Sequence, residues 1–153
     1  MVAAGARFVV IGGFAVIANR FIRATEDIDF LVPDDEGNDR RVLSALLTLD
    51  GVRLRDSVPL REEHLLNMSH LRASTSAGII DILRGGLPPL DFDTVEERAK
   101  DAEYSDVRFS VAGLSSIVGF KRLAGRPRDQ NDLIGLTEIH GELPMERIPG
   151  LDS

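Results

Sequence analysis

Residues 7–32 read RFVVIGGFAVIANRFIRATEDIDFLV and decide the fold. The first five residues of this stretch are mainly β-branched or aromatic and run into Gly12-Gly13, which is typical of a buried strand that enters a tight turn. Residues 14–21 are compatible with a helix, and 26–32 alternate polar and apolar side chains, which predicts a second strand. Strands and helices are therefore expected within one domain.

The rest of the chain continues this mixture. Apolar residues at helical spacing predict a helix over 39–49, and 78–83 reads as a buried strand. We further expect a short strand at 52–55, a helix at 91–100 capped by Asp93 or Thr94, a strand at 107–111, and helices at 114–123 and 127–140 with Pro127 at the first position of the second. Residues 65–75 fit no single element. We expect an α+β (mixed α/β) fold with a short helical C-terminal part.

The composition fits one globular domain. The chain has 153 residues, of which 43% are hydrophobic and 28% charged, and no cysteine. The absence of cysteine excludes a disulfide framework, a thiolate zinc site and a cysteine nucleophile. No apolar stretch is long enough to span a bilayer and no secretory signal is recognisable, so we expect a cytoplasmic protein without membrane contact.

The charge is unevenly distributed. The formal net charge of −7 disfavours a protein that coats nucleic acid non-specifically. Of 25 acidic residues, seven lie in 26–39 and seven in 91–106, which leaves the rest of the chain net basic. We interpret the second window as a solvated acidic helix with no assigned role, and we look for chemistry in the first.

Asp27 and Asp29 form the first candidate site. The period of two along a strand places both side chains on one face, with Ile28 and Phe30 on the other. Adjacent carboxylates repel and raise each other's pKa unless a cation lies between them. An all-oxygen pair suits a hard ion such as Mg²⁺, which shares its remaining positions with phosphates and water. A solvated acidic strand end is the alternative.

Asp81 strengthens the metal interpretation. It lies among apolar residues of the strand expected at 78–83, where an unpaired carboxylate would be costly or would become protonated. It therefore needs a partner, which is either an arginine or a metal ion shared with Asp27 and Asp29. Three carboxylates suit a two-metal site that holds the attacking and leaving oxygens of a displacement.

Two further features point to phosphate. Gly12 and Gly13 let the backbone approach a ligand, and free amides where a helix begins favour an anion such as a triphosphate. Residues 120–133 gather four basic side chains that suit phosphate charge, Lys121, Arg122, Arg126 and Arg128. A solvated helix pair with local ion pairs is the alternative. Neither a P-loop nor Gly-x-Gly-x-x-Gly is present, so a P-loop NTPase and a dinucleotide-binding Rossmann domain have no support.

The three histidines are weaker candidates. His64, His70 and His140 lack the spacing of a zinc site, and the chain has no cysteine to complete one. We interpret them as surface or packing residues.

Four segments together carry a resemblance to a known family. They are Val10-Ile-Gly-Gly-Phe-Ala15, Arg23-Ala-Thr-Glu-Asp-Ile-Asp-Phe-Leu31, Ile80-Asp-Ile82, and Lys121-Arg-Leu-Ala-Gly-Arg-Pro-Arg-Asp129 with Asp132-Leu133. The combination resembles the nucleotidyltransferases of the AbiEii/AbiGii toxin family, within the DNA polymerase β-like superfamily, over roughly residues 7–136. The resemblance implies a nucleotidyltransferase-type mixed β-sheet flanked by helices.

The resemblance also implies roles for ten residues. Asp27, Asp29 and Asp81 would bind Mg²⁺, two ions in all, with Asp81 as ligand or general base. Gly12 and Gly13 would cradle the NTP triphosphate, although many superfamily members have Gly-Ser there and so gain a hydroxyl contact that this chain lacks. Lys121 would contact phosphate as a catalytic residue, Asp132 would support the site from the C-terminal helix, and the remaining nucleotide-binding residues would be Arg23, Thr25 and Arg126.

The predicted function is Mg²⁺-dependent transfer of a nucleotidyl group from an NTP to an acceptor hydroxyl. The resemblance implies the toxin of a toxin–antitoxin or phage-defence pair, with tRNA or another RNA as acceptor, a cognate antitoxin as partner, and substrate-binding surface supplied by another protein or by a second copy in a homodimer. Two alternatives stay open: an antibiotic-type small-molecule nucleotidyltransferase, and an inactive nucleotide-binding module that works through a protein partner. We divide the chain into a nucleotidyltransferase core (1–112), a helical C-terminal part of the same domain (113–143) and a loosely attached tail (144–153).

Overall fold

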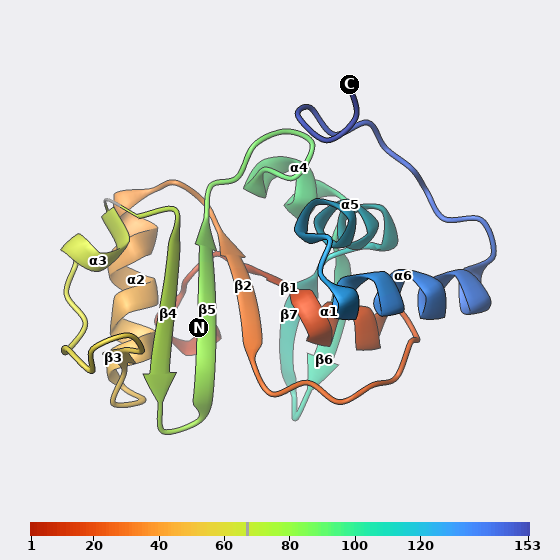
Figure 1. The fold of residues 1–153 in the computed structure, drawn as a ribbon. Helices are drawn as coiled ribbons and strands as arrows, with labels where there is room; N and C mark the ends of the chain where they lie inside the picture. The colour runs from red at the N-terminus through yellow and green to blue at the C-terminus, as the bar shows by residue number, and fades with distance from the viewer. Residues whose placement is uncertain (67) are drawn as a thin grey trace.

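The computed structural model describes residues 1–66 and 68–153, and in them a mixed β-sheet is flanked by helices (Figure 1). The strands are β1 (Val9–Ile11), β2 (Ile28–Val32), β3 (Val52–Arg53), β4 (His70–Thr75), β5 (Gly78–Arg84), β6 (Lys100–Tyr104) and β7 (Val107–Val111). The helices are the 3₁₀ helix η1 (Val2–Ala4) and the α-helices α1 (Gly12–Ala18), α2 (Glu36–Leu47), α3 (Glu63–Leu66), α4 (Phe92–Glu97), α5 (Leu114–Ala124) and α6 (Pro127–His140). The expected α+β class is confirmed.

The strand order brings the predicted site segments together. The sheet runs β3-β4-β5-β2-β1-β7-β6, with β2 parallel to β5 and antiparallel to β1. In this register Asp29 of β2 lies opposite Asp81 of β5 on one side and opposite Ile11 of β1 on the other. The turn that follows Ile11 is therefore held beside both carboxylates.

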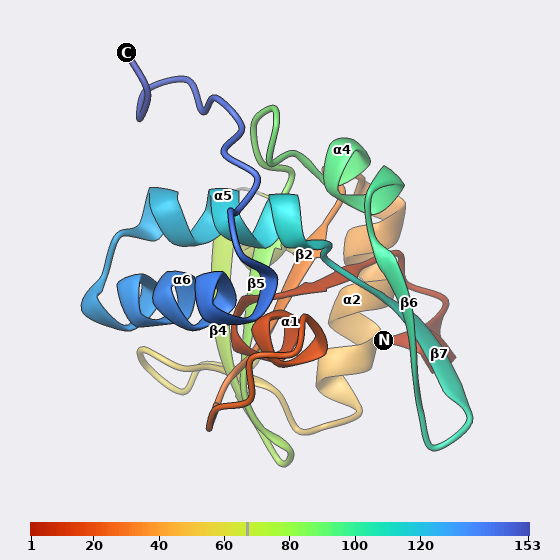
Figure 2. The same ribbon diagram turned by 90° about the vertical axis from the view of Figure 1, so that its right-hand side faces the viewer.

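Helices cover both faces of the sheet. α2 lies on one face, and α1, α5 and α6 lie on the other (Figures 1 and 2). Because side chains alternate along a strand, Phe30 and Ile80 point to the α2 side. Asp29 and Asp81 point to the side that carries α5. One face of the central strands is thus apolar, and the other presents acidic groups to a cavity.

The hydrophobic core fixes the elements that carry these groups. Leu31 in β2, Ile82 in β5, Ile117 in α5 and Leu136 in α6 are almost completely buried. Burial of each side chain contributes about 1.5–3 kcal/mol. The acidic strands and the basic C-terminal helices are therefore held in one packed structure.

Gly12 makes the turn between β1 and α1. Its φ of 66° lies in the left-handed region, and a Cβ there would overlap the carboxylate of Asp29. α1 begins at this residue and ends at Ala18, followed by Arg20 with a φ of 79°. The predicted helix over 14–21 is therefore shifted, because the left-handed backbone at Arg20 stops it early.

Substituting Gly12 with alanine tests this close approach. We expect Gly12→Ala to lower the free energy of unfolding by about 1–2 kcal/mol from left-handed strain plus about 1–3 kcal/mol from overlap with Asp29. Gly5→Ala is the matched control, because Gly5 has a φ of 69° and its nearest neighbour, Arg41, would lie 4.0 Å from a Cβ. Urea unfolding of both variants measures the difference, and equal losses would contradict the close approach.

The second acidic window is not one helix. α4 spans only residues 92–97, and its N-cap is Asp91, which accepts a hydrogen bond from the Thr94 amide, rather than Asp93 or Thr94. From residue 100 the chain forms β6, which pairs with β7 across a turn at Ser105 and Asp106, both with positive φ. Acidic composition suggested a helix, but a two-residue turn with positive φ favours a hairpin.

The boundaries of other helices and strands also differ from the predicted ones. α2 covers 36–47 instead of 39–49, because Asp35 caps it by accepting from the Asn38 amide. The strand expected at 52–55 is limited to two residues. The unassigned segment 65–75 contains the end of α3 and all of β4, with residue 67 outside the described residues. The helices expected at 114–123 and 127–140 are confirmed to within a residue, with Pro127 at the start of α6.

The C-terminal segment is tied to the rest of the molecule. Arg122 donates to the backbone oxygen of Glu146 and to the carboxylate of Asp152, and Arg98 pairs with the Glu146 carboxylate. Ile148 is buried. The expectation of a loosely attached tail is therefore wrong, because its side chains find ionic and apolar partners that lie far away in sequence. In the described residues, no helix has the length and apolar character needed to cross a bilayer.

Candidate active site

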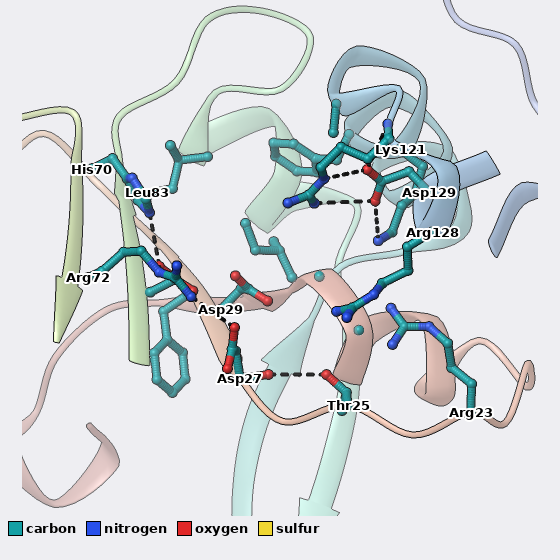
Figure 3. A pocket seen from close by; sticks show the side chains of 18 residues that line it. Arg23, Thr25, Asp27, Asp29, His70, Arg72, Leu83, Lys121, Arg128 and Asp129 are labelled. Carbon is teal, nitrogen blue, oxygen red and sulfur yellow. Dashed lines mark hydrogen bonds and ion pairs between the residues drawn. The ribbon is translucent and has the colours of Figure 1, made fainter. Parts of the chain in front are cut away.

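A cavity of about 620 Å³ opens on the acidic face of the sheet (Figure 3). The β1–α1 turn, the loop before β2, strands β2, β4 and β5, helix α5 and the α5–α6 loop all contribute to its wall. Nine of the ten predicted site residues line it: Gly12, Gly13, Arg23, Thr25, Asp27, Asp29, Asp81, Lys121 and Arg126. The tenth, Asp132, lies behind the wall and is fully buried. The structure thus gathers segments that are spread over more than one hundred residues.

The three carboxylates occupy neighbouring strands. Asp29 and Asp81 are opposite each other in the β2–β5 register, and Asp27 lies one residue before β2 begins. Arg72 of β4 reaches across this group: its Nε lies 2.8 Å from Asp81 Oδ1, and its Nη2 donates to Asp27 Oδ2 at 3.0 Å. The partner that the sequence requires for Asp81 is therefore, in this structure, an arginine.

Asp29 is the carboxylate whose proton affinity is most affected. Burial raises its pKa to about 6, with a further contribution from the negative charges of Asp81 and Asp27 and a smaller opposing one from Lys121 and Arg126. Among the described residues, no ion pair within 4.0 Å joins Asp29 to a cation. It is therefore the acidic group of the cavity that most needs an added positive charge.

The raised pKa predicts a pH dependence of stability for the protein without metal. Between about pH 4 and pH 6 the folded protein holds a proton on Asp29 that the unfolded chain releases, so this group lowers the free energy of unfolding as the pH rises, by at most about 3 kcal/mol at pH 7. Asp29→Asn mimics the protonated form and removes this loss. Urea unfolding in EDTA should show the stability of Asp29→Asn relative to wild type increasing from pH 4 to pH 7. A constant difference would contradict the assignment.

A buried ionic network lies under the basic side of the cavity. Lys121 Nζ is 2.8 Å from both Asp129 Oδ1 and Asp132 Oδ2, and the lysine side chain is only 6% exposed. Arg23 makes a bidentate pair with Asp132, and Arg126 pairs with Asp129. This network joins the loop before β2 to helices α5 and α6. The phosphate contact predicted for Lys121 would have to replace these pairs.

Two observations show how tightly the network is coupled. Burial alone would raise the pKa of Asp129, but hydrogen bonds from Arg126 and Lys121 outweigh it and lower the pKa to about 2. Asp129 and Asp132 are both fully buried. Buried charges of this kind are tolerated only as pairs, so the network fixes the α5–α6 loop relative to β2.

Gly13 and Thr25 hold the loop before β2 against α1. A Cβ on Gly13 would come within 2.5 Å of Thr25 Oγ1 and 3.0 Å of Arg23 Nη2. Thr25 Oγ1 in turn donates to the backbone oxygen of Asp27 at 3.3 Å. The second glycine therefore permits close packing of the residues that precede the carboxylates.

Two residues that line the cavity, His70 and Arg72, were not among the site residues predicted from sequence, and Arg128 was a candidate only as part of the basic cluster at residues 120–133. His70 Nε2 lies 3.0 Å from Asp81 Oδ1, Arg72 bridges two carboxylates, and Arg128 reaches into the cavity beside Arg23 (Figure 3). His70 is exposed, as expected of a surface residue, but its contact with Asp81 was not expected. The alternation of His70, Leu71, Arg72 and Ala73 was the available signal, because it predicts a strand with the two basic residues on one face. By contrast, His140 Nε2 donates to the backbone oxygen of Asn19, the residue after α1, at 2.7 Å, as a packing residue does.

The three carboxylates are the type of ligand that a hard divalent ion prefers. As the side chains stand, no group of three or more potential ligands in the described residues is arranged to hold a metal, and Arg72 lies between Asp27 and Asp81. The donor set is nonetheless all oxygen, it carries three negative charges, and the elevated pKa of Asp29 shows that its charge is poorly compensated. Mg²⁺ prefers such donors.

The fold of the chain is that of nucleotidyltransferases. The crystal structure of ANT(2″)-Ia in complex with adenylyl-2″-tobramycin matches with a TM-score of 0.60 and 13% identity, over 92% of this chain and 85% of that one. The solution structure of the antibiotic-resistance factor ANT(2″)-Ia gives 0.61 and 14%, over 92% and 80%. The lincosamide antibiotic adenylyltransferase LnuA, lincomycin-bound, gives 0.58 and 16%, over 86% of each chain. No family model and no curated protein sequence matches the chain.

Proposed function

We propose that the protein is a Mg²⁺-dependent nucleotidyltransferase that transfers NMP from an NTP to an acceptor hydroxyl. One observation carries the proposal: Asp27, Asp29 and Asp81 face a cavity beside the Gly12 turn, in a fold shared with solved adenylyltransferases. Three costly carboxylates in a cavity are better explained by catalysis than by an inactive binding module.

Each side chain of the site has a distinct role in the proposed reaction. Asp27, Asp29 and Asp81 would hold Mg²⁺, which neutralises the triphosphate and the departing pyrophosphate. Because α1 has only seven residues, we assign the phosphate charge mainly to Arg126 and Arg128 rather than to the helix dipole. The acceptor oxygen would attack the α-phosphorus, the bond to the α,β-bridging oxygen would break, pyrophosphate would leave, and Asp81 would accept the hydroxyl proton.

The charge of the cavity favours a neutral or anionic acceptor. Five cationic side chains line it, Arg23, Arg72, Lys121, Arg126 and Arg128. Three of its four carboxylates, all except Asp29, are already ion-paired. Four of the five cations are also ion-paired, and Arg128, which makes no ion pair within 4.0 Å among the described residues, is the one most available to an anionic group of an acceptor. This supports an RNA hydroxyl, as the AbiEii/AbiGii resemblance implies, and the toxin role with an antitoxin or homodimer partner belongs to the same proposal.

A small-molecule acceptor is the second candidate. It is supported by ANT(2″)-Ia and LnuA, which act on antibiotics. A labelling experiment distinguishes the RNA acceptor from the small-molecule acceptor. The protein is incubated with each α-labelled NTP and Mg²⁺, together with total RNA or with small molecules that are neutral, anionic or polycationic. We expect label on RNA with wild type and none with Asp27→Ala/Asp29→Ala. Label only on a small molecule would move the assignment to the second candidate, and equal labelling by the double variant would overturn the proposed function.

A further inference from the structure

Arg72 lies at the end of a row of charged residues that crosses three strands. In the β4–β5 register Arg72 is opposite Asp81, and in the β5–β2 register Asp81 is opposite Asp29. Figure 3 shows the Arg72 side chain reaching from β4 toward Asp27. Nε is 2.8 Å from Asp81 Oδ1 and Nη2 is 3.0 Å from Asp27 Oδ2. One guanidinium thus binds two carboxylates that come from separate segments.

Arg72 places a positive charge where a divalent cation would bind. Its guanidinium contacts Oδ2 of Asp27 and Oδ1 of Asp81, so an ion shared by these two carboxylates would be repelled by it. His70 already contacts Asp81 Oδ1 from the same strand at 3.0 Å. The acidic group therefore has a counter-cation already in contact with it, and the positive charge of that cation opposes metal binding.

Arg72 has room to move. Its side chain is 45% exposed, whereas Lys121 on the opposite wall is 6% exposed and held by two buried carboxylates. The guanidinium faces the cavity that the carboxylates line. Arg72 and Lys121 thus differ: Lys121 is held by buried carboxylates outside the metal group, whereas Arg72 pairs with Asp27 and Asp81, the carboxylates that a metal would take.

We propose that Arg72 is a built-in counter-cation of the metal-free site, which bridges Asp27 and Asp81 and must leave them when a divalent ion binds. This rests on the proposed function, because it takes these carboxylates as metal ligands. Arg72 then sets how much divalent cation the protein requires, and the released guanidinium can meet the negative charge of nucleotide or acceptor.

The test is a titration of Mn²⁺ in the absence of nucleotide, followed by electron paramagnetic resonance. Arg72→Gln should tighten Mn²⁺ binding about tenfold if the open conformer is about one tenth of the wild-type population. Arg72→Lys keeps the charge but has no fork to bridge two carboxylates, so it should fall between wild type and Arg72→Gln. Arg108→Gln, on the exposed β6–β7 hairpin, should equal wild type.

Each other outcome has a definite meaning. The inference is overturned if wild type and Arg72→Gln bind Mn²⁺ with equal affinity. It is also overturned if Arg72→Lys has the Mn²⁺ affinity of wild type while Arg72→Gln binds Mn²⁺ more tightly, because Arg72 then does not compete by bridging. If none of the proteins binds Mn²⁺, the metal site of the proposed function fails as well. Because a variant could misfold, the Nε–H signal of Arg72 in wild type is followed too: Mg²⁺ should shift it, and an unchanged signal at saturation would overturn the inference.

Discussion

Asp29→Asn should lower the rate of NMP transfer by about a thousandfold or more, which corresponds to about 4 kcal/mol of transition-state stabilisation. The amide cannot supply the negative charge that a metal requires, while its size and its place beside Gly12 are nearly unchanged. The measurement is the initial rate of label transfer from an α-labelled NTP at saturating Mg²⁺.

The same variant separates a functional loss from a folding defect. Since burial raises the pKa of Asp29 to about 6, the neutral amide should make the metal-free protein more stable at pH 7, not less. Asp101→Asn, an exposed residue of β6, is the control and should leave both rate and stability unchanged. Wild-type transfer by Asp29→Asn would remove this carboxylate from the mechanism.

Asp132→Ala should have the largest effect on stability. This fully buried carboxylate accepts from both Arg23 and Lys121, and its removal leaves two cations with reduced compensation. Breaking a buried ion pair in this way costs about 3–5 kcal/mol. We expect a loss of that size in the free energy of unfolding by urea denaturation.

An exposed pair provides the comparison for Asp132. Glu103 lies 3.5 Å from Arg108, with side chains 53% and 84% exposed, so Glu103→Ala should change stability by at most about 1 kcal/mol. A loss of less than 1 kcal/mol for Asp132→Ala would show that the network is not required to hold the α5–α6 loop.

The carboxylates could be found from sequence because strand alternation is a local rule. It places Asp27 and Asp29 on one face, and the apolar neighbours of Asp81 require a partner for that residue. The identity of that partner could not be found in the same way, since Arg72 reaches Asp81 only through the pairing of β4 with β5. Cross-strand partners depend on register, and register is a property of the whole sheet.

Two other errors have similar causes. β6 is wrongly predicted as part of an acidic helix, because the composition of residues 91–106 resembles a solvated helix, whereas the strand predicted at 107–111 is confirmed as β7. The deciding residues are the pair at the turn between them, Ser105 and Asp106. The C-terminal segment is expected to be loose because its two prolines and Gly150 favour no regular element. Arg98 and Arg122, which bind it, lie more than twenty residues away in sequence.

The central claim is that the three carboxylates bind a nucleotide through a divalent ion. Calorimetric titration with an NTP analogue whose α,β-bridge cannot be cleaved tests it most directly, in Mg²⁺ and in EDTA. We predict binding by wild type in Mg²⁺ and affinity at least about tenfold weaker in EDTA and in Asp29→Asn. Equal affinity in Mg²⁺ and EDTA, unchanged by Asp29→Asn, would contradict the account.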